Sequence, residues 1–176
     1  MPILLRTRDG LSLEYDPKLG GFKHAGTVPC LQCGTCCSRW QAQVNAREIA
    51  AIAETMGVPL AEFYGQYIRE YPVRPDTYLI RHKDGACVFL RREGGRALCA
   101  IHSFKPEVCR AWKPSLARKE CRDGLRRLGQ GLQFLTPDNL NLSLEEMAAF
   151  CQSLRDYSIM EQIGSRYEQK ETCSSP

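Results

Sequence analysis

The residues with the clearest capacity for chemistry are cysteines, which number ten in this chain of 176 residues. Four of them fall within eight residues, as Cys30, Cys33, Cys36 and Cys37. A Cys-x-x-Cys turn can point two sulfurs at one metal ion, as in many zinc sites. Neighbouring side chains diverge, so we expect Cys36 and Cys37 to serve two sites or one polynuclear cluster. Gly34 lets the backbone between these cysteines turn sharply.

A second group of cysteines follows at longer spacings, as Cys87, Cys99, Cys109 and Cys121. None of these forms a motif alone. Both groups together supply eight thiols, which match two four-coordinate sites. The sites could hold two zinc ions, one zinc ion and one iron–sulfur cluster such as 4Fe-4S, or two iron–sulfur clusters. The run differs from the bacterial ferredoxin motif, in which a proline follows the last cysteine. We predict that all eight cysteines are metal ligands.

Other side chains have weaker claims to the site. His102 lies three residues after Cys99 and could replace one thiolate as a ligand, although such a histidine is more often a strand-end residue. Arg110 could donate a hydrogen bond to a cluster sulfur or a bound anion, or form a surface ion pair. Cys151 is expected in an apolar helix face. His24 and His82 are weaker candidates for ligands than His102. Cys173, in the C-terminal tail, is expected to have no role in the site.

Composition places the chain among ordinary globular proteins, with 43% hydrophobic and 25% charged residues. No apolar run approaches the ~20 residues that cross a bilayer. The first apolar stretch is interrupted by Arg6, Arg8 and Asp9, unlike a signal peptide. We therefore expect a cytoplasmic protein without membrane association. Disulfides do not persist in that compartment, which favours metal binding by clustered cysteines.

The predicted fold class is α+β, with a small antiparallel sheet or hairpins surrounded by short helices and organised around a cysteine-ligated metal site. Gly-containing turns predict strands over 5–8, 11–14, 78–82, 86–90 and 97–101. Cys87 and Cys99 would then lie on facing strands. Apolar periodicity and capping residues predict helices over 45–57, 59–71, 106–112, 116–128 and 143–157, with another helix start at 158–161. Residues 22–29 are expected to form a loop and 170–176 to fray.

Positive charge is concentrated in residues 91–127, which hold 11 Lys and Arg against 4 Asp and Glu. Within this segment, the predicted helix could present one basic face, formed by Arg118, Lys119, Arg122, Arg126 and Arg127. These cations could offset the negative charge of metal-bound thiolates, because four thiolates on one divalent ion leave a charge of about −2. They could also bind nucleic acid. We favour compensation over nucleic-acid binding.

The complete pattern resembles the YkgJ-type cysteine-cluster family, whose motif is CxxCxxCC. The resemblance covers about residues 28–125 and rests on three segments: Cys30-Leu-Gln-Cys33-Gly-Thr-Cys36-Cys37, Cys87-Val-Phe-Leu90, and Cys99-Ala-Ile-His102 with Lys105-Pro106-Glu-Val-Cys109-Arg110. It implies chelation of zinc or iron, including iron–sulfur binding, by these cysteines, and no particular reaction. The sequence departs from the family pattern at Lys105, where Arg is usual, and at His102, where Tyr is usual.

These observations divide the chain into an N-terminal hairpin extension (1–27), a cysteine-cluster domain (28–128) and a C-terminal helical extension (129–176). The main hypothesis is a protein that binds iron–sulfur or zinc, with a redox role and a redox or protein partner. It would be an iron–sulfur oxidoreductase or an accessory protein. One alternative is a structural zinc module that binds nucleic acid or a protein through residues 110–127. Another is an enzyme with an open metal position beside His102.

Overall fold

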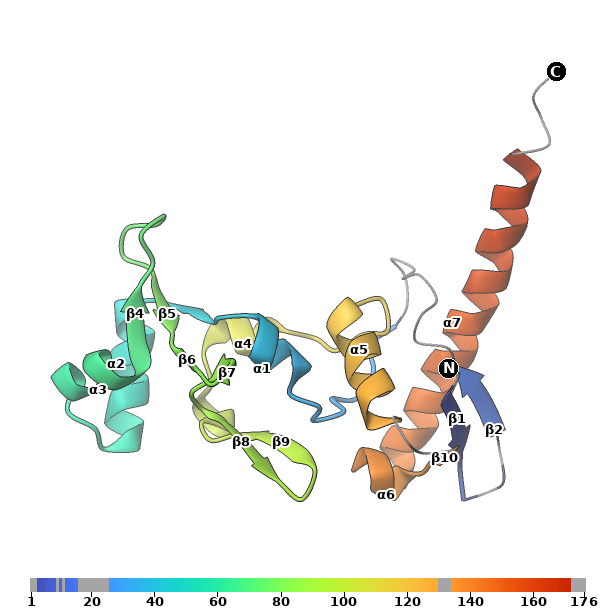
Figure 1. Cartoon of the computed structure of the whole chain (residues 1–176), viewed down its shortest axis with the longest axis horizontal. Helices are drawn as coiled ribbons and strands as arrows, with labels where there is room; N and C mark the ends of the chain where they lie inside the picture. The colour runs from blue at the N-terminus through green and yellow to red at the C-terminus, as the bar shows by residue number, and fades with distance from the viewer. Residues whose placement is uncertain (1–2, 9, 11, 16–25, 130–133, 172–176) are drawn as a thin grey trace. The chain divides into compact units, whose positions relative to one another are not determined.

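The computed structural model describes residues 3–8, 10, 12–15, 26–129 and 134–171 (Figure 1). The chain forms two compact units. Unit 1 combines residues 1–33 with 114–176, and unit 2 is the continuous segment 34–113. Each unit buries its own cluster of apolar side chains. No helix in the described ranges is both long enough and apolar enough to cross a membrane.

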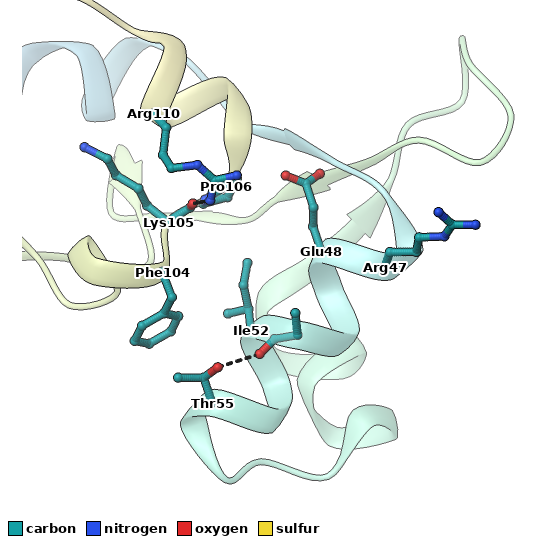
Figure 2. A pocket seen from close by; sticks show the side chains of 9 residues that line it. Arg47, Glu48, Ile52, Thr55, Phe104, Lys105, Pro106 and Arg110 are labelled. Carbon is teal, nitrogen blue, oxygen red and sulfur yellow. Dashed lines mark hydrogen bonds between the residues drawn. The ribbon is translucent and has the colours of Figure 1, made fainter.

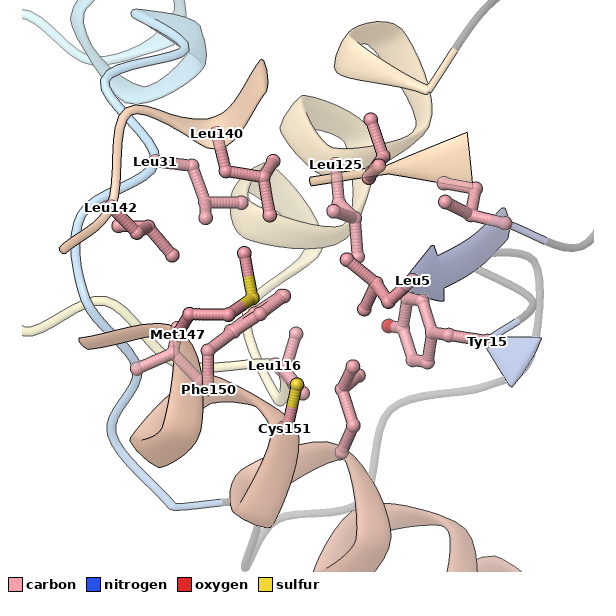
Figure 3. Packing of buried hydrophobic residues seen from close by; sticks show 14 of the residues in the cluster. Leu5, Tyr15, Leu31, Leu116, Leu125, Leu140, Leu142, Met147, Phe150 and Cys151 are labelled. Carbon is pink, nitrogen blue, oxygen red and sulfur yellow. The ribbon is translucent and has the colours of Figure 1, made fainter. Parts of the chain in front are cut away.

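Unit 1 has one small sheet and three helices in its described residues. Its elements are β1 (Ile3–Arg6), β2 (Ser12–Tyr15), α5 (Lys119–Leu128), β10 (Phe134–Leu135), α6 (Pro137–Leu140) and α7 (Leu144–Glu171). β1 pairs antiparallel with β2 and parallel with β10. The strands and helices share one core (Figure 3), in which Leu5, Leu125 and Phe150 are fully buried. Burial of each such side chain contributes roughly 1.5–3 kcal/mol, so this core joins the two separate segments of unit 1.

The start of α7 follows directly from its sequence. The backbone N–H of Glu146 donates to Ser143 Oγ at 3.2 Å, and the backbone N–H of Ser143 donates to Glu146 Oε2 at 2.9 Å. This reciprocal capping box satisfies N–H groups that a helix start otherwise leaves unpaired. Met147, Phe150 and Leu154 then recur at helical spacing and are all buried. The cap fixes where α7 begins, and its apolar face attaches it to the core.

Unit 2 contains most of the short elements. They are α1 (Thr35–Arg39), β3 (Gln43–Val44), α2 (Ala46–Met56), α3 (Leu60–Tyr67), β4 (Ile68–Glu70), β5 (Tyr78–Ile80), β6 (His82–Lys83), β7 (Ala86–Cys87), β8 (Leu90–Glu93), β9 (Arg96–Cys99), the 3-10 helix η1 (His102–Phe104) and α4 (Glu107–Ala111). β3, β5 and β4 form an antiparallel sheet, while β6–β7 and β8–β9 are separate hairpins. Ile49, Phe63 and Ile80 lie in the core of this unit.

The predicted α+β class, the capping box of Asn45 and Glu48 on α2, and the Gly57 stop are confirmed. So are the turns Asp84-Gly85 and Gly94-Gly95, whose residues all have positive φ between 52° and 81° and so require glycine or a tolerant residue. The fold therefore follows the sequence most closely where a cap or a two-residue turn dictates the backbone.

The prediction that Cys87 and Cys99 lie on facing strands is wrong. Cys87 is paired with His82 on β6, and Cys99 is paired with Leu90 on β8. Each glycine turn closes its own two-stranded hairpin, and Val88 and Phe89 separate β7 from β8. The two cysteines therefore belong to neighbouring hairpins along the chain.

Several element boundaries also differ from the predictions. α3 ends at Tyr67 because Ile68–Glu70 pairs with β5, and α5 begins at Lys119 because Ser115 and Arg118 close a turn before it. The second helix start at 158–161 is wrong, since α7 continues through that segment to Glu171. The short elements α1, β3, β10 and α6 were not predicted. Residues 22–25 of the expected loop and 172–176 of the expected frayed tail lie outside the described residues.

Candidate metal centre

Unit 2 gathers five of the eight predicted ligands on four elements. Cys36 and Cys37 lie on α1, Cys87 on β7, Cys99 on β9 and Cys109 on α4. All five are half-buried. Residues far apart in the sequence, on a helix, two hairpins and a second helix, thus contribute thiols to the same compact unit.

Gly34 allows α1 to approach the β8–β9 hairpin closely. Its φ of 71° is the left-handed conformation, and a Cβ atom at this position would lie 2.7 Å from the Cβ of Ala97 and 3.3 Å from Leu90 Cδ2. Real Cβ atoms do not approach each other so closely, so the position requires glycine. Because Cys36 and Cys37 follow two and three residues later, this contact sets their position relative to the hairpin that ends in Cys99.

The adjacent thiols on α1 lie close to each other. The Sγ atoms of Cys36 and Cys37 are 3.9 Å apart. The pKa of Cys36 is raised because its thiol shares a hydrogen bond with Cys37, and burial raises it further. A tetrahedral zinc site with Zn–S bonds of about 2.3 Å has sulfur–sulfur edges of about 3.8 Å. The observed separation therefore fits two ligands of one ion, and the expectation that the pair serves two sites or a polynuclear cluster stays a prediction.

The remaining thiols of unit 2 influence one another electrostatically. Burial raises the pKa of Cys87, and the backbone N–H of Phe89 opposes this by donating to its sulfur. Burial raises the pKa of Cys109 to about 11, with further increases from the charges of Cys87, Cys99 and Cys36. The ammonium group of Lys105 acts in the opposite direction on the pKa of Cys109. These four cysteines are thus near enough to one another for charge on one to disfavour charge on another.

The donor set fits a thiophilic metal, and Cys36 and Cys37 already lie at a separation that suits two ligands of one ion. In the part of the chain that the structure describes, no three His, Cys, Asp or Glu side chains are arranged to hold one ion. An N–H group that donates to sulfur and a nearby cation nevertheless stabilise thiolates bound to zinc or iron, whereas burial alone disfavours the charged form of a thiol. The thiols of unit 2 must therefore move closer together for three or more of them to bind one metal ion.

Unit 1 carries the other three predicted ligands, Cys30, Cys33 and Cys121. Cys30 is exposed, while Cys33 and Cys121 are half-buried, with Cys33 packed against the core of unit 1. Their role as ligands stays a prediction. Cys151 is only 2% exposed within that core, which confirms its predicted apolar environment. His24 and Cys173 lie outside the described residues.

The histidines and Arg110 have the following surroundings. His102 is exposed at the start of η1, and its side chain makes no hydrogen bond or ion pair within the described segments. His82 Nε2 lies 3.2 Å from the backbone oxygen of Trp40. Arg110 Nη1 donates to the backbone oxygen of Lys105 at 2.6 Å. None of these contacts is to a cysteine sulfur.

The basic helix α5 uses several of its cations within the protein. Asp123 forms ion pairs with Lys119 at 2.8 Å and with Arg126 at 3.0 Å. Arg122 Nη1 donates to the backbone oxygens of Leu116 and Ala117, both at 2.8 Å. These bonds cap the turn before α5 and neutralise part of its charge, which weighs against an open basic face for nucleic acid.

Two contributors to the site were not assigned a role from the sequence. The Phe89 N–H that reaches Cys87 lies two residues after it, and a Cys-x-x turn is a recognisable signal for such a bond. Lys105 was noted only as a departure from the family pattern, although its charge acts on Cys109. Lys105 lies four residues before Cys109 and directly before Pro106, where the helix starts. This spacing could have indicated that its charge acts on Cys109.

Comparison with known proteins agrees with this chemistry. A family model described as "CxxCxxCC: Putative zinc- or iron-chelating domain" matches residues 29–152. The match includes all eight predicted ligand cysteines and extends beyond residue 125 into α7. No curated protein and no solved structure matches the chain. The domain boundaries proposed at 27/28 and 128/129 stay a prediction. The match spans most of the chain, and the protein therefore belongs to the CxxCxxCC family of zinc- or iron-chelating domains, as the sequence resemblance indicated.

Proposed function

We propose that the protein binds zinc or an iron–sulfur cluster through cysteine thiolates. The observation that supports this most strongly is the grouping of five half-buried thiols on α1, β7, β9 and α4. Cys36, Cys37, Cys87, Cys99 and Cys109 supply the ligands from unit 2. The three cysteines of unit 1 that complete the proposed set of eight are Cys30, Cys33 and Cys121.

The identity of the metal decides what the site does. Zinc held by four thiolates has no open position and is structural, whereas a thiolate-bound iron–sulfur cluster can exchange electrons. With iron, the protein would have a redox role and would exchange electrons with a partner. In both cases Lys105 would offset thiolate charge at Cys109, and the Phe89 N–H would stabilise the Cys87 thiolate.

Anaerobic purification followed by elemental analysis and visible spectroscopy tests this proposal. A brown protein with iron and acid-labile sulfide, bleached by dithionite, would support a redox cluster. A colourless protein with bound zinc would support a structural site. Protein that holds neither metal after anaerobic purification with supplied iron and zinc would contradict the proposal.

A pair of cysteine variants assigns the bound metal to the proposed site. Cys109→Ser should weaken metal binding by more than about tenfold, because a hydroxyl is a poor substitute for a thiolate. Cys151→Ala is the matched control, since Cys151 lies in the apolar core of unit 1 and should leave metal content unchanged. Metal content is measured by mass spectrometry of the native protein and by elemental analysis.

A further inference from the structure

A pocket of about 310 Å³ lies in unit 2, and no cysteine is among the described residues that line it. Its walls come from α2 and from the segment that leads from η1 into α4 (Figure 2). Ile52, Phe104 and Pro106 give it an apolar lining. Small-molecule sites in proteins occupy roughly 300–1,000 Å³ and combine apolar walls with a few polar groups, so this pocket has the size of a site for a small ligand.

Three cations also line the pocket, Arg47, Lys105 and Arg110. The bond from Arg110 Nη1 to the backbone oxygen of Lys105, at 2.6 Å, holds the guanidinium group against the segment that starts α4. A guanidinium group has five N–H donors, so Arg110 keeps donors for a ligand. Arg47 and Lys105 extend to opposite sides in Figure 2, and neither side chain forms an ion pair with another described residue.

Glu48 is the one carboxylate among the residues that line the pocket, and both of its oxygens are engaged. Oε2 accepts from the backbone N–H of Asn45 at 3.1 Å, and Oε1 accepts from the backbone N–H of Glu107 at 2.9 Å. Glu48 therefore links α2 to α4, which are the two walls of the pocket. With three cations against one occupied carboxylate, the lining carries an excess of positive charge.

We propose that this pocket binds a small organic carboxylate that has an apolar body. The carboxylate pairs with Arg110 and with Arg47 or Lys105, and the apolar body packs between Ile52 and Phe104. A fixed guanidinium group favours such a ligand because little side-chain freedom is lost on binding. Arg110 directly follows Cys109, so the ligand would bind next to the helix that carries one of the proposed metal ligands. The proposal goes beyond metal binding and does not require it.

Titration of the full chain with benzoate tests the proposal, with calorimetry for affinity and backbone amide shifts for location. Benzoate should bind and shift amides of α2 and residues 104–110. Arg110→Gln and Arg47→Gln should each weaken binding by about fivefold, as expected for a partly exposed charge pair. Ala51→Phe, at an exposed position that lines the pocket, should block binding by filling the space. Arg91→Gln removes an exposed cation on β8 and is the matched control.

Neutral benzamide and inorganic phosphate separate the contributions of charge and apolar contact. Both should bind more weakly than benzoate. The proposal is overturned by equal affinity for either probe, by benzoate binding that survives Ala51→Phe, or by no benzoate binding to the wild-type chain. Metal content is measured in each sample. Because α2 carries no cysteine, loss of benzoate binding in Arg47→Gln or Ala51→Phe with unchanged metal content reports on the pocket alone.

Discussion

At the scale of single residues, the metal proposal depends on how closely α1 approaches the β8–β9 hairpin. Gly34 permits this approach because it has no Cβ and adopts a positive φ of 71°. Gly57, at the end of α2, has a similar φ of 66° but open space around its Cβ position. The two glycines therefore separate the cost of backbone conformation from the cost of a steric clash.

Alanine substitutions at both glycines measure that difference. Gly57→Ala should lower the free energy of unfolding by about 1 kcal/mol, which is the cost of a left-handed alanine. Gly34→Ala should cost about 2–4 kcal/mol, because the clash with Ala97 adds a packing penalty, and it should also weaken metal binding. Urea unfolding monitored by circular dichroism gives both values.

The double variant Gly34→Ala/Ala97→Gly provides the control for this comparison, since it removes the atom that the new Cβ meets. It should recover part of the lost stability. Equal costs for Gly34→Ala and Gly57→Ala would show that α1 does not pack against the hairpin as described.

At the scale of elements, the capping box of α7 makes stability depend on pH. The pKa of Glu146 is lowered from its ordinary value of 4.5 because the backbone N–H and then the hydroxyl of Ser143 donate to it. A carboxyl group whose pKa is lower in the folded state stabilises the fold above its unfolded pKa and loses that contribution as pH falls through the folded value. The contribution of Glu146 should therefore begin to fall as pH drops below about 4.5 and should be lost once pH has passed through the lower folded-state pKa.

Glu146→Gln should make the unfolding free energy less dependent on pH in this acidic range, while retaining a side chain that can cap. Ser143→Ala removes the donor hydroxyl and should act in the same direction. Urea unfolding at a series of pH values checks the two variants and their combination. Additive effects of the two substitutions would indicate that the residues do not act as one capping unit.

The sequence predicts a helix or strand well only where a few neighbouring residues determine its structure. Asn45 and Glu48 at α2, and the glycine turns of the hairpins, were predicted because a few adjacent residues determine these structures. β10 has only two residues and pairs with β1, which lies far away in the sequence. Such a strand is defined by its partner, and its own residues give no periodicity to detect.

Prediction of the candidate site is limited in the same way, because the site also depends on contacts between residues that are far apart in the sequence. The spacing of the cysteines predicted a metal-binding chain, and membership of the CxxCxxCC family supports that prediction. The pairing of Cys87 with Cys99 across one hairpin was wrong because strand register depends on where each turn closes. The contact between Gly34 and Ala97 joins residues 63 positions apart, and a pattern of local propensities contains no information on such a contact.

At the scale of the whole molecule, metal binding should contribute to stability. Unit 2 is built from strands of two to four residues, which supply few backbone hydrogen bonds. A metal that binds the folded state and not the unfolded chain stabilises by about 2.7 kcal/mol when its concentration is a hundred times Kd. Removal of the metal with a chelator under reducing conditions should therefore lower Tm by several degrees, as measured by calorimetry. Re-addition of the metal should restore Tm, and Cys109→Ser should lose this response.

The central claim is that cysteine sulfurs bind the metal, and X-ray absorption at the zinc or iron edge tests it most directly. The sample is the full chain purified anaerobically with its metal. The account predicts a first coordination shell of sulfur with metal–sulfur distances of about 2.3 Å, and a loss of sulfur neighbours or of metal in Cys109→Ser. A first shell made only of nitrogen and oxygen, or a sulfur shell that is unchanged in that variant, would contradict the account.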